Sequence, residues 1–253
     1  FVRTTTWTGC RSGADVVFAA INGTEALFPI QGAPNLDLRD LAAAVAIGLI
    51  AGGAARGFAY LVREAKVRSA LLRPVTRVVG SGVAIGALVL LSQALTGDTL
   101  ALGPGYRTIA WSIEPDHAVG IVLGLLVIRA AATILAVGGG GVGGLFIPLV
   151  IEGALLGRAV GGVVGAPSSV LFPVLGVAAF LGAGYRVPLA AVMFVAESTG
   201  KPGFVVPGLI AAAASQITMG PRSVSVYQQA RHPGHLEGRL DLPLTSVVRT
   251  EAA

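Results

Sequence analysis

The sequence has 253 residues, of which 54% are hydrophobic and 12% charged, and its mean hydropathy is +0.78. Soluble domains carry about 25% charged residues, so this composition excludes an ordinary soluble protein and predicts an all-α membrane protein. The net charge of +5 comes from basic residues spread over short loops without interleaved aromatic residues, which argues against nucleic-acid binding. The single cysteine permits neither an internal disulfide nor a cysteine metal cluster.

The N-terminal third of the chain predicts a short helix and then two long ones. Apolar pieces such as 14–21, followed by a segment with two prolines at 28–35, indicate a helix and a connector at the membrane surface. No signal-peptide pattern precedes the first apolar run, so we expect Phe1 not to be the natural start of the protein. Two long helices are predicted next, at about 38–66 and 74–96.

Charge and glycine spacing add expectations for these two helices. By the positive-inside rule, the basic segment between them is a cytoplasmic loop, and the acidic loop at 98–116 faces the other side. Gly82 and Gly86 have the spacing that lets helix backbones touch, although a chain with 36 glycines also produces this spacing by chance. The basic residues of the loop are Arg63, Lys66, Arg68, Arg73 and Arg77.

A glycine run is the first informative motif. It follows a polar break at 103–112, which is a loop or a short helix, and a predicted helix at about 116–137. The run occupies residues 138–144 and would be a flexible linker in a soluble protein, but here it lies in the uncharged stretch 130–151. Backbone polar groups cannot face lipid, so the run must be buried in protein or line a water-filled cavity. We therefore predict an interrupted helix.

The segments after the run indicate a transport site. Pro148 suits the first turn of a new helix, whose later glycines, at intervals of four from Gly153 to Gly165, form a smooth ridge for a neighbouring helix. The apolar segment 187–196 is too short to cross about 30 Å of hydrocarbon and predicts a half-helix. Paired short or broken membrane segments are the best sequence indication of a transport site at the bilayer midplane.

A helix that begins inside the membrane offers a neutral surface for an anion. Its first amides have no helical acceptor, and the helix dipole adds partial positive charge, which makes the N–H groups of Leu145, Phe146 and Ile147 candidate donors. One helix end stabilises an anion by only about 0.3 to 2 kcal/mol, against an idealised desolvation cost of about 20 kcal/mol. Water, hydroxyl groups and donors from elsewhere must therefore complete the site.

At these residues the chain resembles the CLC family of chloride channels and chloride/proton antiporters. Residues 143–148, Gly-Gly-Leu-Phe-Ile-Pro, are similar to the selectivity motif in the second half of that family, and the match extends to 158. The segments 128–134 and 184–199 resemble the helix before the motif and the Arg-x-Pro-Leu segment after it. The order and spacing of the segments agree, and the resemblance runs from about residue 13 to residue 232.

The resemblance implies a fold, a function and a site. The fold is a CLC-like bundle of tilted and broken transmembrane helices, with only the second inverted-repeat half present, in residues 1–232. The function is chloride transport by a homodimer with two separate pores in a bacterial inner (plasma) membrane, without a cofactor and with a first half of the same protein outside this chain. The implied anion-binding residues are Gly143, Gly144, Leu145, Phe146, Ile147, Pro148 and, through its hydroxyl, Tyr227.

Several questions stay open at this point. The family's first half supplies a serine in GSGIP and a glutamate in GREGP, and neither motif occurs in this chain. The choice between channel and antiporter, the anion selectivity and gating by voltage or pH are therefore undecided. Alternatives are a transport-inactive fragment or structural subunit and a fluoride-selective relative.

Charged residues and the C-terminal tail complete the expectations. Glu152 is an acid inside an apolar helix, which makes it a candidate for a proton or gating role. The alternative is that Glu152 is a structural acid on the helix face, either paired or solvated. Arg129 and Arg186 are interpreted as paired structural charges, because a fixed charge in the path would trap an anion. Residues 233–253 are a cytoplasmic tail, either the start of a CBS region or disordered.

Enzymatic and metal-binding functions find no support in the sequence. No Lys-Ser or Lys-Thr follows the glycine run and no strand precedes it, which excludes a P-loop. No paired acids, Ser-His pair or Cys-His pair is recognisable, so we do not expect an enzyme. The three histidines lack ligand spacing on one helix face, and we assign no metal.

Overall fold

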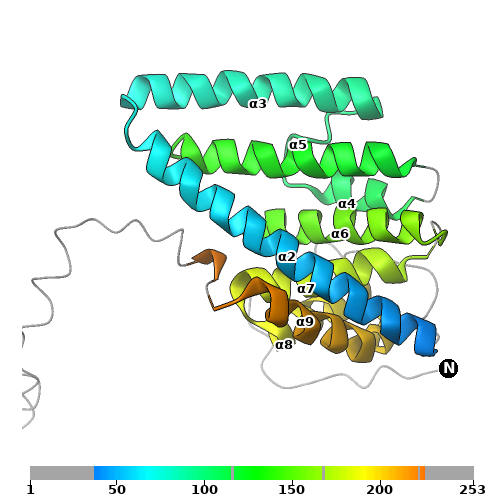
Figure 1. The fold of residues 1–253 in the computed structure, drawn as a ribbon. Helices are drawn as coiled ribbons and strands as arrows, with labels where there is room; N and C mark the ends of the chain where they lie inside the picture. Colours follow the sequence, from blue (N-terminus) through cyan, green and yellow to red (C-terminus); the bar gives the residue numbers. More distant parts are fainter. Residues whose placement is uncertain (1–36, 115–116, 167–168, 222, 226–253) are drawn as a thin grey trace, which may run out of the picture.

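The computed structural model describes residues 37–114, 117–166, 169–221 and 223–225, and within them it contains helices and no strand (Figure 1). Five of the described helical segments are long and apolar enough to cross a membrane, α9 being counted together with η1. The elements are α2 (Leu38–Ser69), α3 (Pro74–Thr96), α4 (Tyr106–Ile113), α5 (Val119–Gly138), α6 (Phe146–Val163), α7 (Leu171–Tyr185), α8 (Pro188–Thr199), the 3-10 helix η1 (Pro202–Phe204) and α9 (Val205–Met219).

Local sequence explains the helix ends that were predicted best. The expected helix at 74–96 is confirmed as α3, which has Pro74 in its first turn and ends at Gly97 in the left-handed region, φ 78°. Proline fits a first helical turn, and glycine adopts positive φ without strain. The helix α8 repeats this arrangement, with Pro188 at its start and Gly200 at φ 64° after its end.

Helices α6 and α7 form the centre of the described structure. Every residue of α7 from Leu171 to Gly184 is buried. The glycines of α6 face this helix: a Cβ on Gly153 would lie 2.6 Å from the carbonyl oxygen of Gly176, and one on Gly157 would collide with that of Phe172. The predicted glycine ridge is thus confirmed at these two positions, and it brings two backbones into direct contact.

The long helix α2 crosses the other side of this centre, over α7 and α9 (Figure 1). Gly48 and Gly52 are the contact points with α9, because any Cβ there would collide with the backbone at Ala211 or Ser215. The hydroxyl of Thr218 donates a hydrogen bond of 2.8 Å to the carbonyl oxygen of Leu49. Small residues and one backbone-directed hydroxyl therefore hold α2 against α9.

Helix α3 lies at the edge of the bundle, next to α5 (Figure 1). Ser92 is the one residue of α3 that is buried. A Cβ on Gly82 or Gly86 would meet nothing within 4 Å, so the close helix contact that their spacing suggests is absent from the described part of the chain. This agrees with the reservation that a glycine-rich chain produces the spacing by chance.

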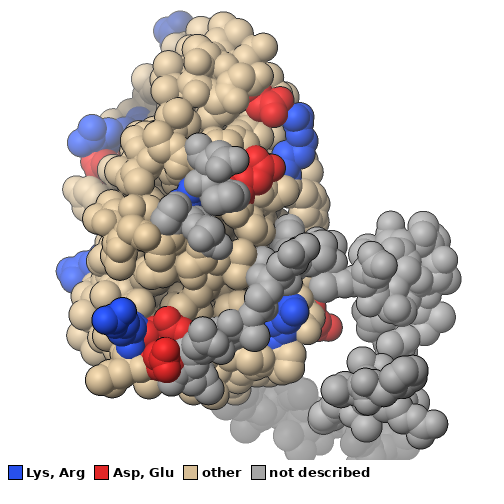
Figure 2. Space-filling view, turned by 90° about the vertical axis from the view of Figure 1, so that its right-hand side faces the viewer, with Lys and Arg blue, Asp and Glu red and all other residues tan. Residues whose placement is uncertain are grey.

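Helix α8 confirms the prediction of a half-helix, and α7 is shorter than its uncharged run suggested. Helix α8 has 12 residues and a length of about 18 Å, which is less than the hydrocarbon thickness of about 30 Å. Helix α7 has 15 residues, although the uncharged run 165–185 is long enough to span, because the first residues of that run, such as Gly165 with φ 80°, lie outside the helix. The face in Figure 2 shows few charged side chains, as an apolar surround requires.

Candidate functional site

The break between α5 and α6 places a helix start inside the bundle. Helix α5 ends at Gly138, Gly140 has φ 97°, and α6 begins only at Phe146. In Figure 1 the two helices lie side by side, and α6 starts level with the interior of α5, well away from either of its ends. The expected interruption at the glycine run is therefore confirmed, and the first turn of α6 lies inside the helix bundle.

The first turn of α6 leaves backbone donors without helical acceptors. Its first helical hydrogen bond runs from the Leu149 amide to the Leu145 carbonyl oxygen, at 3.0 Å. Among the described residues, the amides of Phe146 and Ile147 have no backbone acceptor, no side chain caps the helix, and Pro148 has no N–H. The Leu145 side chain is buried in the core and fixes the turn. Two main-chain N–H groups are thus held in place and open.

A cavity of about 380 Å³ adjoins this turn. Its walls come from the glycine run, from α5, including Arg129 and Thr133, and from the loop 101–104. A space of this size holds several water molecules, and its polar groups can bind them. Five of the residues predicted for the site line it together: Gly143, Gly144, Leu145, Ile147 and Pro148.

Phe146 points to a different environment, an aromatic cluster. Its ring lies 4.9 Å from that of Phe194 in an edge-on contact and 6.4 Å from that of Tyr185. The Tyr185 hydroxyl lies near the Leu145 backbone. Of the three amides predicted as donors, that of Leu145 therefore already has a neighbouring hydroxyl.

Sequence reasoning missed Tyr185 and Phe194 as residues of the site. Both lie in the segment 184–199, which was interpreted only as the opening of a short helix. The available signal was that Tyr185 immediately precedes the Arg-x-Pro-Leu motif, at the junction of two short helices. Transport sites are often formed at junctions between short or discontinuous membrane helices.

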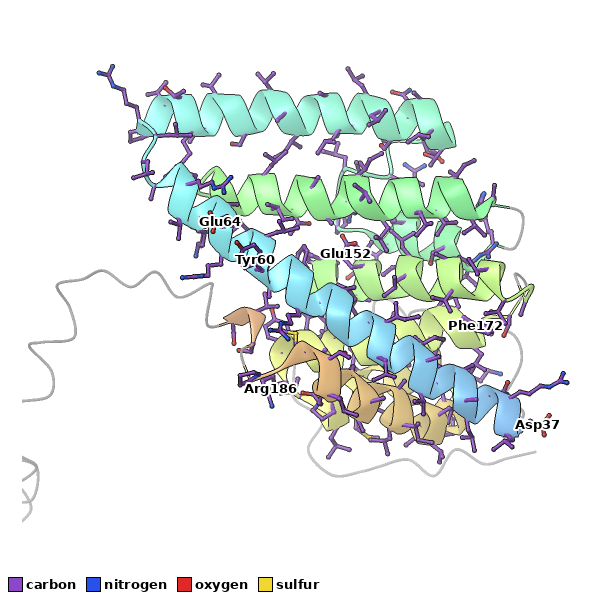
Figure 3. The ribbon with its side chains drawn as sticks, viewed as in Figure 1. Asp37, Tyr60, Glu64, Glu152, Phe172 and Arg186 are labelled. Atoms are coloured by element: carbon purple, nitrogen blue, oxygen red, sulfur yellow. The ribbon has the colours of Figure 1, made fainter. Side chains whose placement is uncertain are left out.

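Two buried charges lie near the cavity. Glu152 is 2% exposed, its Oε1 has no hydrogen-bond partner among the described residues, and it lies on the side of α6 that faces α5 (Figure 3). Its electrostatic partner is Arg129 of α5, whose Nη1 donates a 2.9 Å hydrogen bond to the Ala101 carbonyl oxygen. None of the ion pairs among the described residues involves Arg129, so its pairing with an acid stays a prediction. The alternative of a solvated acid does not fit Glu152.

The junction near Arg186 leads toward the remaining predicted residue. Arg186 follows α7 with φ 60° and donates a hydrogen bond to the Gly220 carbonyl oxygen just after α9. Gln216 donates a second bond, of 2.9 Å, to the carbonyl oxygen of Gly182. These bonds fix the end of α9 against α7. Tyr227 lies beyond it, outside the described residues, as do residues 233–253.

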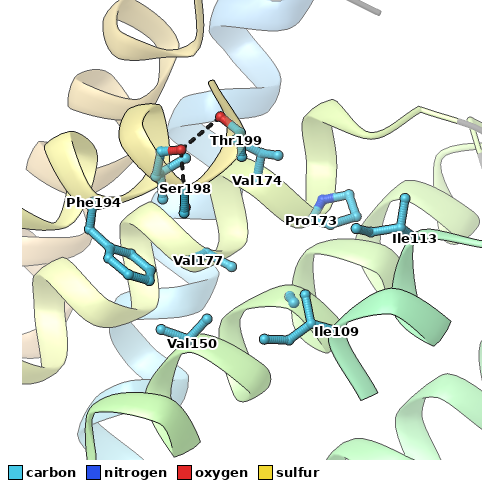
Figure 4. A pocket seen from close by; sticks show the side chains of 11 residues that line it. Ile109, Ile113, Val150, Pro173, Val174, Val177, Phe194, Ser198 and Thr199 are labelled. Atoms are coloured by element: carbon cyan, nitrogen blue, oxygen red, sulfur yellow. Dashed lines mark hydrogen bonds between the residues drawn. The ribbon is translucent and has the colours of Figure 1, made fainter. Parts of the chain in front are cut away.

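A second cavity, between α4, α6, α7 and α8, is apolar and has a volume of about 40 Å³ (Figure 4). Ile109, Val150 and Phe194 are among its walls. The hydroxyls of Ser198 and Thr199 at its edge donate to the Val195 carbonyl oxygen at 3.3 and 2.7 Å. With its hydroxyl protons already used, this cavity offers nothing to compensate an ion for lost water.

Comparison with known proteins gives a family and several relatives. Residues 6–220 match the model of a family described as voltage gated chloride channel. The H(+)/Cl(-) exchange transporter ClcA of Vibrio parahaemolyticus is 28% identical over 213 residues, which cover 78% of this chain and 44% of the relative. The voltage-gated ClC-type chloride channel ClcB of Citrobacter koseri is 26% identical over 218 residues, covering 82% and 50%. The chain thus spans about half the length of these relatives.

Solved structures share the fold. A slow cyanobacterial Cl-/H+ antiporter superposes with a TM-score of 0.72 at 19% identity, covering 85% of this chain and 52% of that chain. A CLC-type fluoride/proton antiporter superposes with a TM-score of 0.68, also at 19% identity, covering 85% and 53%. The arrangement of broken helices around the glycine run is therefore that of an established membrane fold.

Proposed function

The chain belongs to the voltage-gated chloride channel family, and we propose that it is part of an integral membrane protein that moves chloride across a bacterial inner membrane. One observation carries this proposal: α6 begins inside the bundle, and its first turn leaves main-chain amides open beside a cavity of about 380 Å³. Amides at a helix start bind anions through their N–H groups and the helix dipole.

The strength of such a site suits transport. One helix end supplies about 0.3 to 2 kcal/mol, which is less than the several kcal/mol needed to remove an anion from water. Water in the cavity, the Tyr227 hydroxyl and a first half of the same protein supply the remaining donors in this proposal. Neutral and individually weak ligands hold a halide without trapping it, which conduction requires.

The coverage of the relatives supports a contribution from outside this chain. The chain corresponds to 44% of one exchange transporter and 50% of one channel, so the other half of each has no counterpart here. In this proposal the anion lies between the first turn of α6 and that other half. Without it the chain would be the transport-inactive subunit considered above.

The homodimer is a further part of the proposal. Large apolar side chains are exposed on α8 and α9: Leu189 is 62% exposed, Val206 is 51% and Ile217 is 77%. Lipid or a second protomer can cover such side chains. Cross-linking of the complete protein through cysteines introduced at positions 189 and 206 distinguishes the two.

Proton-coupled exchange is the form of transport that Glu152 favours. Its buried carboxyl group has one oxygen without a partner, and an ionised carboxylate in such a place is costly unless it is paired. We assign to Glu152 the binding of a proton, with Arg129 as the electrostatic neighbour of its ionised form. Passive chloride conduction and fluoride transport are the competing outcomes, and flux measurements with each ion and with a proton gradient separate them.

The experiment that tests the proposal is halide efflux from liposomes containing the complete protein. A double variant, Phe146→Pro with Tyr227→Phe, removes one open amide and one hydroxyl and should alter both the efflux rate and the selectivity among halides. Tyr60→Phe removes a hydroxyl from an exposed site on α2 and is the matched control (Figure 3). Wild-type flux and selectivity in the double variant would remove these residues from the site, and absence of any flux by the complete protein would favour the inactive subunit.

A further inference from the structure

A third cavity, of about 430 Å³, lies where the end of α2, the start of α3 and the end of α5 meet. This is the end of the bundle where the basic segment 63–77 lies, which the positive-inside rule assigns to the cytoplasmic surface. The cavity is separate from the one beside α6, and the proposed transport function makes no use of it. Arg68 and Arg77 line it, and no acidic residue does.

Arg77 is the basic residue of this cavity wall that lies next to the glycine run. A Cβ on Gly140 would lie 2.7 Å from its Nη2, so the guanidinium rests directly against the backbone of the glycine run. Its Nε is buried and has no hydrogen-bond acceptor among the described residues. Buried donors in native proteins almost always have a partner. Because Nε is enclosed, a ligand in the cavity would reach the terminal nitrogens of this guanidinium.

The neighbouring polar groups indicate an anionic ligand. Arg68 is engaged through Nε with Glu64 Oε1 at 2.8 Å, which leaves its two terminal nitrogens available. The hydroxyls of Ser69 and Ser81 donate to carbonyl oxygens of their own helices, at 3.2 and 3.0 Å, so the remaining side-chain donors of the cavity wall are the guanidinium groups and the Thr76 hydroxyl. Paired guanidinium groups are suited to the oxygens of a phosphate.

The surroundings favour a phosphate attached to a lipid over a free ion. Leu72 and Leu135 form apolar parts of the cavity wall. Beside the cavity, Val75, Val79 and Val83 make an exposed stripe along α3, with 75%, 58% and 70% of each side chain accessible. A ligand with a phosphate at the membrane surface and acyl chains along α3 matches both features, and basic clusters at this surface attract anionic lipids.

We propose that this cavity binds the phosphate headgroup of one anionic phospholipid, with Arg77 and Arg68 as its ligands and the valine stripe of α3 as the path of an acyl chain. The competing explanation is purely structural: Arg77 would only neutralise the partial negative charge at the C-terminal end of α5. The two explanations differ in what they predict for lipid binding.

The test is native mass spectrometry of the complete protein titrated with phosphatidylglycerol and, separately, with phosphatidylcholine. We expect the wild type to retain one phosphatidylglycerol per protomer and to prefer it over phosphatidylcholine. Arg77→Gln should weaken phosphatidylglycerol binding about fivefold, the usual effect of one basic residue at a membrane surface. Arg73→Gln removes the same charge from the same loop outside the cavity and should have little effect.

Further arms separate the remaining outcomes. Thr76→Trp fills the cavity without changing its charge and should also displace the lipid, which keeps the proposal testable if Arg77→Gln fails to fold.

Equal weakening by Arg77→Gln and Arg73→Gln would indicate unspecific surface attraction and overturn the proposal. Release of the lipid by millimolar inorganic phosphate would replace it with a free-phosphate site. A lower melting temperature with unchanged lipid preference would leave only the structural role. None of these readouts depends on chloride flux.

Discussion

Helices α3 and α6 carry the same glycine spacing, and the structure uses it differently. Gly153 and Gly157 press the backbone of α6 against α7, whereas Gly82 and Gly86 of α3 meet nothing within 4 Å. Helix α6 is buried along most of its length, and α3 has one buried residue. The difference teaches that glycine spacing permits a close contact, while burial from all sides decides whether one forms.

The largest expected effect comes from filling the contact between α6 and α7. Gly157→Leu places a side chain against the Phe172 backbone, which cannot move aside, so we expect destabilisation of about 3 kcal/mol or more and loss of folded protein. Gly82→Leu in α3 should change stability by less than about 0.5 kcal/mol. Thermal unfolding of the complete protein, followed by size-exclusion chromatography, measures both. Equal losses in the two variants would mean that α3 is also closely packed.

The second prediction compares the first turns of the same two helices. Ile147→Pro removes one open amide at the second position of α6, where proline is compatible with helix geometry. Loss of one hydrogen bond to a charged ligand, about 1.5 to 3 kcal/mol, should lower halide affinity roughly tenfold or more. Val75→Pro makes the same change in α3, away from the cavity beside the first turn of α6, and should leave liposome efflux unchanged. Similar efflux from both variants would exclude the Ile147 amide as an ion ligand.

The third prediction concerns the buried acid, a feature that α3 lacks. Glu152→Gln keeps the shape of the side chain but cannot release a proton, so proton movement coupled to chloride should fall about tenfold or more while chloride movement continues. Separate pH and chloride electrodes on the same liposome sample measure the two fluxes. Glu197→Gln, on an exposed side of α8, is the control. Unchanged coupling in Glu152→Gln would show that this carboxyl group only balances Arg129.

The smallest expected effect is at the aromatic neighbour of the site. Tyr185→Phe removes the hydroxyl near the Leu145 backbone and leaves the contact with Phe146 in place. One more amide then becomes available, so chloride should bind about threefold more tightly, in line with about 0.5 to 1 kcal/mol for a neutral hydrogen bond. Isothermal titration with Tyr60→Phe as control measures this. Weaker binding would instead identify the Tyr185 hydroxyl as a ligand of the ion.

Local patterns were sufficient for some of the structure. The Pro74 start and Gly97 end gave the bounds of α3, and a run of glycines in an uncharged stretch predicted the break before Phe146. The short α8 followed from the ten apolar residues between Arg186 and Glu197. In each case the cause lies within a few residues of the effect, as with helix ends in general.

Contacts between distant segments were not predictable in this way. The approach of Tyr185 to Leu145 joins residues 40 positions apart and depends on how α7 packs on α6. Gly82 has open surroundings because no described helix packs against that face of α3. The spacing of glycines within α3 does not reveal whether a neighbouring helix is present. The assignment of Tyr227 and of the tail 233–253 stays a prediction, since both lie outside the described residues.

The open donors of α6 belong to the main chain, and this affects how the site responds to mutation. Alanine, valine or methionine at Phe146 or Ile147 would present the same N–H group, so a conventional alanine scan would record the residues around the donors and miss the donors themselves. Natural variation at these positions is free to reshape the cavity while its ion-facing chemistry stays constant. Proline, or an ester in place of the peptide, is the change that tests the site directly.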